Sequence, residues 1–245
     1  MGASSRPDDF DFAGAMGDVK QTAAETLNYF VSYIEKWRVA FSARLKQELT
    51  GFVLAGHSFG GYQVGQYALR YPQHVTKLYL LSPVGIRIPP EGEVPLERSK
   101  RLIAEAQKDI DLPEVPLWAF FLLEHAWKAK LTPMKLCRFM GPKWTSEQLP
   151  LLLDACHLTT EPERSTCHDY IYQLVMRKST TELGFFNLFN NGCQAHFPLG
   201  EHTFEMPMSF IIGAEDWVLY CDRHDERNMH WGQILVETNQ KKHGE

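Results

Sequence analysis

The fold is decided by the stretch Gly51-Phe52-Val53-Leu54-Ala55-Gly56-His57-Ser58-Phe59-Gly60-Gly61. Its first half is a short apolar run, which predicts a buried β-strand, and residues 62–71 predict a helix that Pro72 ends. Between them lies Gly-x-Ser-x-Gly, whose glycines permit a tight turn that presents the serine hydroxyl at a helix N-terminus. A plain tight turn is the alternative. We interpret Ser58 as a nucleophile, and the backbone N–H of Phe59 as a donor to the substrate oxyanion.

The flanking segments predict an α/β fold. Apolar residues recur at spacings of three and four over residues 27–45, which is typical of one face of a helix. Further apolar runs at 78–81, 208–212 and 234–236 predict strands. Because these strands are continuously apolar and alternate with helices, we expect a parallel sheet covered on both faces.

The chain divides into three zones by pattern. Residues 1–90 carry the serine motif, and residues 208–245 return to the same strand-rich pattern. The zone between them, 91–207, has no convincing strand pattern, and its prolines (113, 116, 133, 142, 150 and 162) divide it into short helices. We expect this zone to be a helical cap inserted in the α/β domain.

A serine nucleophile needs a base and a carboxylate that orients the base. In the fold typical of this motif, the acid and then the histidine follow the serine in chain order. Asp216 follows the 208–212 strand and is the predicted acid, with Glu215 as a weaker substitute. His243 follows the last predicted strand and is the predicted base. His57 adjoins the serine but points away from it on such a turn, so we expect it to pack or to line the site.

Two other arrangements give weaker signals. The pairs His168-Asp169 and His224-Asp225 resemble metal-site dipeptides, but the remaining histidines provide no ligand framework. Cys156 and His157 would be a second candidate for a nucleophile with its base. This signal is weak, because neighbouring side chains on a helix point apart. We therefore predict no metal site and no cofactor.

Composition excludes several classes of protein. The 245 residues suit one large domain, and 25 basic against 30 acidic residues give a net charge of −5, which provides no general attraction for nucleic acid. No apolar run is long enough to span a membrane. Residues 1–11 are small, polar and acidic, unlike a secretory signal, and five cysteines without Cys-x-x-Cys spacing suit a reducing compartment.

The sequence resembles the α/β-hydrolase superfamily, and within it the subfamily named for α/β-hydrolase domains four and five. The serine motif carries the superfamily resemblance. The subfamily resemblance rests on Gly2-Ala3-Ser4-Ser5-Arg6-Pro7, Glu35-Lys36-Trp37-Arg38, Ser82-Pro83-Val84-Gly85, Leu131-Thr132-Pro133 with Arg138, Gly141 and Pro142, Asp169-Tyr170-Ile171-Tyr172 and Asp216-Trp217. The subfamily includes lysophospholipases, lysophosphatidic acid acyltransferases and a lipid-droplet lipase co-activator.

The resemblance implies a serine acyl hydrolase that acts on lipid esters through Ser58, Asp216 and His243. The alternatives are a lysophosphatidic acid acyltransferase and a non-catalytic lipid-binding co-activator. In the cap, Trp118 and Phe121 are expected to contact the substrate, although such a stripe is more often core. The protein is then expected to be cytoplasmic and peripheral on lipid droplets or membranes, with the mitochondrion as an alternative.

The sequence departs from the subfamily at its start. Members begin with several strands and a His-Gly loop that gives a second oxyanion donor, and neither is found before residue 51. We therefore expect a partial sheet from which the N-terminal strands of the fold are missing, with the strand of residues 51–55 at an exposed apolar edge. The chain is then expected to be a fragment, weakly active unless a protein partner covers that edge.

Overall fold

The computed structural model describes residues 12, 18–89, 91–109, 116–155, 158, 160–178 and 181–213. These residues divide into two compact units. The sheet unit comprises the described residues of 18–109 and 187–213, and the helical unit comprises residue 12 and the described residues of 116–186. The expected cap, residues 91–207, is a wider range than the helical unit.

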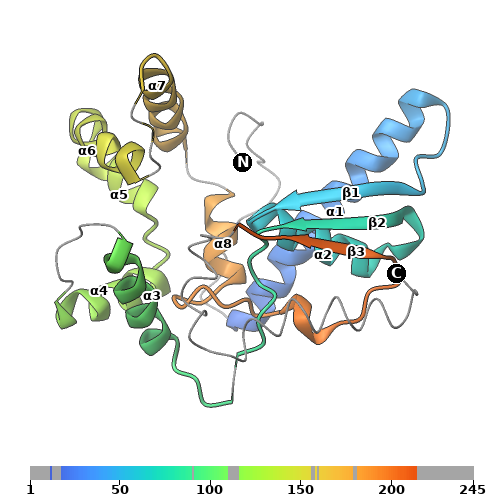
Figure 1. Ribbon diagram of the computed structural model, residues 1–245, viewed down its shortest axis with the longest axis horizontal. Helices are drawn as coiled ribbons and strands as arrows, with labels where there is room; N and C mark the ends of the chain where they lie inside the picture. Colours follow the sequence, from blue (N-terminus) through green and yellow to red (C-terminus); the bar gives the residue numbers. More distant parts are fainter. Residues whose placement is uncertain are drawn as a thin grey trace. The chain divides into compact units, whose positions relative to one another are not determined.

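The elements follow one another as labelled in Figure 1. The sheet unit contains α1 (Val19–Leu45), β1 (Phe52–His57), α2 (Phe59–Arg70), a 3-10 turn (Pro72–His74), β2 (Val75–Leu81), α3 (Pro95–Asp109), a second 3-10 turn (Leu199–Glu201) and β3 (Met208–Ile211). The helical unit contains α4 (Leu117–Lys128), α5 (Pro133–Met140), α6 (Pro142–Ala155) and α7 (Glu163–Met176). Helix α8 (Glu182–Leu188) begins in the helical unit and ends in the sheet unit.

The described strands form one parallel sheet in the order β1-β2-β3, which confirms the predicted α/β class. Their register places Leu54, Leu78 and Met208 side by side across the three strands. Within the described residues β1 pairs with β2 alone, so it lies at an edge of this sheet as expected. The predicted strand at 234–236 lies outside the described residues.

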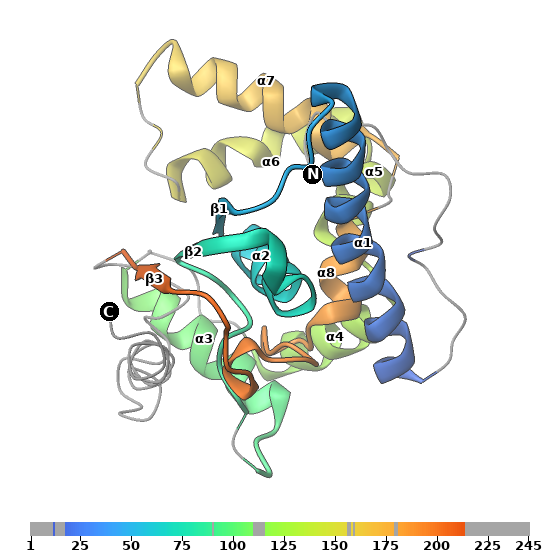
Figure 2. The ribbon, with the colours of Figure 1, turned by 90° about the vertical axis from the view of Figure 1, so that its right-hand side faces the viewer.

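Among the described residues the two faces of the sheet differ, and only one of the two predicted covering layers is seen there. Helix α2 packs against β1 and β2, and α1 packs on α2 (Figure 2). On the opposite face, alternate residues of β1 are exposed, and Val53 keeps 59% of its surface accessible. The apolar run of β1 is therefore buried on one side only in the described part of the chain.

The core of the sheet unit lies around α2. Its largest fully buried side chains are Tyr62, Tyr67, Phe189, Phe204, Leu78, Leu80, Leu188, Leu199, Val31 and Thr26. Helix α1 contributes Phe30 and Val31 to this core, but Trp37 and Phe41, on the same predicted apolar face, are exposed and stack on each other at 5.4 Å between ring centroids. The predicted apolar face of α1 is thus buried only in its first half.

A partly buried ion pair within α1 connects this helix to α2 through Tyr67. Arg38 donates two hydrogen bonds from Nε to Glu35, at 3.0 and 2.9 Å, and the hydroxyl of Tyr67 in α2 donates to the same carboxylate at 2.8 Å. The hydrogen bond from Arg38 holds the pKa of Glu35 below its usual value, against the effect of burial. The segment Glu35-Lys36-Trp37-Arg38 therefore has a structural role in joining the helices.

Proline shapes the helical unit, but not always by ending helices. Pro133 and Pro142 begin α5 and α6, where a missing N–H costs nothing. Pro150 was expected to separate two helices, yet it lies inside α6. Proline leaves the carbonyl four residues earlier without its helical donor. That carbonyl, on Ser146, lies 3.2 Å from Nε2 of His168 in α7, and this contact explains how α6 continues.

A second ion pair joins α5 to the start of α8 within the helical unit. Arg138 in α5 pairs with Glu182 in α8 and also donates to the carbonyls of Val175 and Arg177, at 2.9 and 3.0 Å. Thr132 caps α5 through Lys135 N–H and donates to Glu182 at 2.7 Å. These contacts give Thr132 and Arg138, two of the residues behind the resemblance, a shared structural role. None of the helices that the structure describes is both long and apolar enough to cross a membrane.

Candidate active site

Ser58 occupies the junction between β1 and α2. Strand β1 ends at His57, α2 begins at Phe59, and Ser58 is the residue between them. Its backbone has φ 54° and ψ −122°, the combination that glycine adopts at the first central position of a type II′ turn. A side chain in this region is strained, and such strain is concentrated at functional sites. The hydroxyl of Ser58 makes no hydrogen bond within the described part of the chain.

Three backbone hydrogen bonds hold the strained residue in place. The N–H of Ser58 donates to the carbonyl of Leu81, the last residue of β2, at 3.0 Å. The Ser58 carbonyl in turn accepts from the N–H groups of Tyr62 in α2 and Val84 after β2, at 3.2 and 3.3 Å. Because β2 and α2 both hold the turn, the surrounding structure compensates for its strain.

The glycines around the serine have unequal roles. A Cβ on Gly56 would lie 2.5 Å from the carbonyl oxygen of Gly60, so only glycine fits where β1 passes the first turn of α2. A Cβ on Gly60 would meet nothing within 4 Å, whereas one on Gly61 would lie 2.9 Å from Cβ of Pro83. The second sterically required glycine is therefore Gly61, which the Gly-x-Ser-x-Gly pattern does not include.

An aromatic cluster surrounds the side chain of Phe59. Its ring lies 5.6 Å from that of Phe30 in α1, 6.4 Å from that of Tyr62 and 6.0 Å from that of Phe189 after α8. Burial raises the pKa of the Tyr62 phenol, which donates to the carbonyl of Phe197 at 3.0 Å. This packing fixes the first turn of α2, where N–H groups lack helical acceptors and can bind an anion.

The structure places three of the predicted site residues in the sheet unit. Ser58, Phe59 and His57 lie together at the carboxyl end of β1, with the side chain of His57 exposed. Trp118 and Phe121 lie on α4 in the helical unit, where 63% and 49% of their surfaces are accessible.

Asp216 and His243 lie outside the described residues, so their roles stay predictions. The strand that leads toward Asp216 is described: the N–H of Ser82 donates to the carbonyl of Ile211 at 2.7 Å. The carboxyl end of β3 is thereby tied to the carboxyl end of β2, which also holds Ser58.

Sequence reasoning missed Phe30, Phe189 and Gly61 as parts of this site. Gly61 had a visible signal, because two consecutive glycines follow Phe59. Phe189 had none, since it lies in a segment with no catalytic pattern and reaches Phe59 only in the folded chain.

The chain is similar to known proteins over most of its length. The family described as alpha/beta hydrolase fold matches residues 39–219. A probable 1-acylglycerol-3-phosphate O-acyltransferase of Oryza sativa subsp. japonica is 30% identical over 89% of this chain and 48% of its own length. The 1-acylglycerol-3-phosphate O-acyltransferase of Arabidopsis thaliana is 31% identical over 89% and 47%.

A human relative, 1-acylglycerol-3-phosphate O-acyltransferase ABHD5, is 29% identical over 89% of this chain and 54% of its own length. The chain thus spans about half the length of the curated relatives it matches.

Proposed function

The chain belongs to the α/β hydrolase fold family, and on this premise we propose that it is a serine acyl hydrolase acting on lipid carboxylic esters. The observation that carries the proposal is the backbone of Ser58, a non-glycine residue at φ 54° between a parallel strand and a helix. An unrelated tight turn would gain nothing from a strained serine there, whereas a nucleophile gains an accessible hydroxyl at a helix N-terminus.

The proposed reaction has two half-reactions. Ser58 Oγ attacks the ester carbonyl while His243 accepts its proton and Asp216 orients the imidazole. The negative charge on the carbonyl oxygen is stabilised by the N–H of Phe59. The C–O bond to the alcohol then breaks, the alcohol takes the proton from His243, and an acyl-serine remains. Water, deprotonated by His243, releases the acid and restores Ser58.

A second candidate is acyl transfer to 1-acylglycerol-3-phosphate, and the names of the rice, Arabidopsis and human relatives favour it. This reaction shares the acyl-serine and differs in the acceptor, because a lysolipid hydroxyl replaces water. A comparison of acid release with phosphatidic acid formation from one acyl donor distinguishes the two.

Labelling with a fluorophosphonate probe tests the nucleophile. We expect the 245-residue chain to be labelled and Ser58→Ala not to be, with loss of short-chain esterase activity by up to about a millionfold. Equal labelling of the parent and the Ser58→Ala variant overturns the assignment. A folded parent chain without labelling or esterase activity favours the non-catalytic lipid-binding alternative.

We also propose peripheral contact of the helical unit with lipid surfaces. Helices α4 and α5 expose large apolar side chains, among them Trp118 and Phe139, the latter 84% accessible. Residues 117–143 carry four lysines and one carboxylate, Glu124, which pairs with Lys128, in a chain with a net charge of −5. Arg138 is not counted, because it pairs with Glu182. Exposed apolar side chains beside basic ones favour binding to an anionic lipid surface.

Liposome flotation tests this contact. Replacement of Trp118 and Phe121 by serine should reduce flotation with anionic vesicles, and replacement of Trp37, an exposed tryptophan on α1, is the matched control. Hydrolysis of a water-soluble short-chain ester should stay at the parent rate in both variants. Unchanged flotation of the α4 variant contradicts the proposal.

A further inference from the structure

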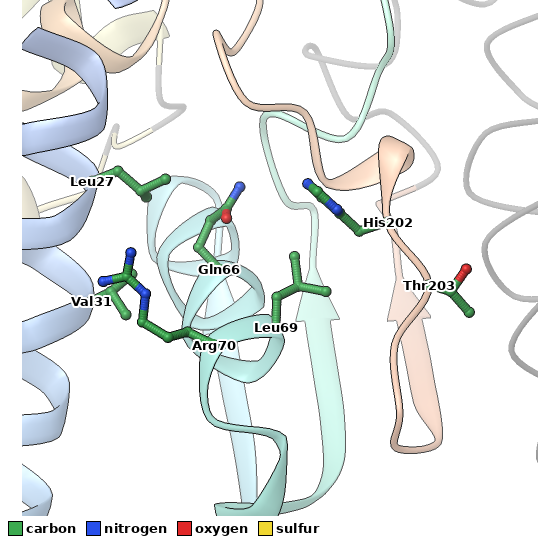
Figure 3. A pocket seen from close by; sticks show the side chains of 7 residues that line it. All are labelled: Leu27, Val31, Gln66, Leu69, Arg70, His202 and Thr203. Carbon is green, nitrogen blue, oxygen red and sulfur yellow. The ribbon is translucent and has the colours of Figure 1, made fainter. Parts of the chain in front are cut away.

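The sheet unit contains a cavity of about 430 Å³ away from Ser58. It lies between α1, α2 and residues 202–203 (Figure 3). Gln66 and Arg70, which line it, lie more than two turns beyond Ser58 on α2, or about 12 to 18 Å along the helix. The cavity is therefore separate from the serine site.

One wall of the cavity carries a positive charge without a carboxylate partner. Arg70 reaches from α2 to α1, where Nη1 donates to Oδ1 of Asn28 at 2.6 Å. No carboxylate within the described residues lies within ion-pair distance of its guanidinium. Because a guanidinium has five N–H donors and is always protonated, most of its donors and its whole charge are left for a ligand.

Three more polar side chains line the same cavity: Gln66, His202 and Thr203. Gln66 is buried, and its Nε2 donates to the carbonyl of Phe197 at 2.8 Å, which fixes the amide while Oε1 accepts no hydrogen bond from the described residues. The imidazole of His202 also has no hydrogen-bond partner in that part of the chain. In Figure 3 the ring of His202 points from the 202–203 segment toward the side of α2 that carries Gln66.

The remaining lining is aliphatic. Leu27 and Val31 from α1 and Leu69 from α2 form it, and Val31 is fully buried. A ligand with a charged head alone would leave Leu27 and Leu69 facing water, and a purely apolar ligand would desolvate Arg70 without compensation. The combination suits a molecule that is anionic at one end and aliphatic along its body.

We propose that this cavity binds a small anionic amphiphile, with a carboxylate or phosphate head at Arg70 and a short aliphatic body against Leu27, Val31 and Leu69. His202 supplies a further hydrogen bond. The binding site does not depend on Ser58 being a nucleophile. It gives the protein a second place, apart from the serine, at which a fatty acid or a phosphate monoester with an aliphatic chain is recognised.

Isothermal titration of the 245-residue chain with octanoate, octyl phosphate and octanol tests the site. We expect saturable binding of at least one anion, and weaker or no binding of octanol, which has the same chain without the charge. Comparison of octanoate with octyl phosphate identifies which head is preferred. Arg70→Gln should weaken binding of that anion about five- to tenfold.

Three variants and one modification locate the site. Arg70→Lys should retain most of the affinity, His202→Gln should weaken it to a smaller extent, and Arg44→Gln, a change of an exposed arginine outside the cavity, should not alter it. Protein labelled at the serine with a fluorophosphonate should bind the anion as tightly as unlabelled protein. Thermal melting of each variant verifies that it is folded.

Four results overturn the proposal: no saturable binding of either anion, octanol binding as tightly as both, unchanged affinity in folded Arg70→Gln, or loss of binding after labelling. The last result would place the anion at the serine site. If the serine is not labelled at all, the proposed nucleophile fails while the titrations with Arg70→Gln still decide the cavity.

Discussion

Replacing Ser58 by glycine should remove catalysis and yet stabilise the protein relative to Ser58→Ala. Both variants lose the hydroxyl, so both should lose fluorophosphonate labelling and esterase activity. They differ in the backbone, because alanine keeps the Cβ that is strained at φ 54° and ψ −122°, and glycine does not.

The size of the difference follows from two opposing effects. A non-glycine residue in this backbone region costs about 1–3 kcal/mol, which glycine recovers. Glycine also gains freedom in the unfolded chain, which costs about 0.5–1 kcal/mol. Ser58→Gly should therefore be more stable than Ser58→Ala by about 1 kcal/mol. For a chain of 245 residues this corresponds to a Tm higher by about 2–4 °C.

Thermal unfolding followed by circular dichroism measures this difference. The matched control is the pair Ser32→Gly and Ser32→Ala in the middle of α1, where glycine should be the less stable variant by about 1 kcal/mol. If Ser58→Gly is less stable than Ser58→Ala, as in the control pair, the turn is not strained and the structural argument for the nucleophile fails.

Three further outcomes are expected. Gly56→Ala should unfold the serine turn and abolish labelling of the nucleophile, because a Cβ at residue 56 would lie 2.5 Å from a carbonyl oxygen. Gly60→Ala should keep the parent Tm, because a Cβ at residue 60 meets nothing within 4 Å. Equal melting temperatures of the two variants would contradict this. Glu35→Gln should cost about 1–3 kcal/mol at pH 7 by weakening the hydrogen bonds from Arg38 and Tyr67. Since folding lowers the pKa of Glu35 from 4.5, the stabilisation is present above that pH and is lost as pH falls through the folded-state pKa, so urea melts of parent and variant should converge in acid. Strand β1, at the edge of the described sheet with Val53 exposed, is expected to pair with a second copy of the chain, because unpaired apolar edge strands associate. Val53→Lys should reduce this pairing, seen as a smaller concentration dependence in sedimentation velocity.

The sequence determined the parts of this protein that short segments control. Residues 51–61 predicted strand, turn and helix in the right order, and the structure has β1, Ser58 and α2 there. The apolar run at 208–212 likewise predicted a strand parallel to the others, which β3 confirms. These features follow from alternation, apolar runs and turn residues within a few positions of one another, so a local pattern carries them.

Only the tertiary structure decided how that turn is supported. Gly61 is required because Pro83, which follows the next strand, lies against it. Phe189 contacts Phe59, although the whole helical unit lies between these two residues in the sequence. Pro150 stays inside α6 because the carbonyl that it leaves without a donor meets His168 of another helix. Each of these contacts joins residues far apart in the chain. A pattern read along the sequence reports which residues are near in number, whereas packing and hydrogen bonding depend on which are near in space.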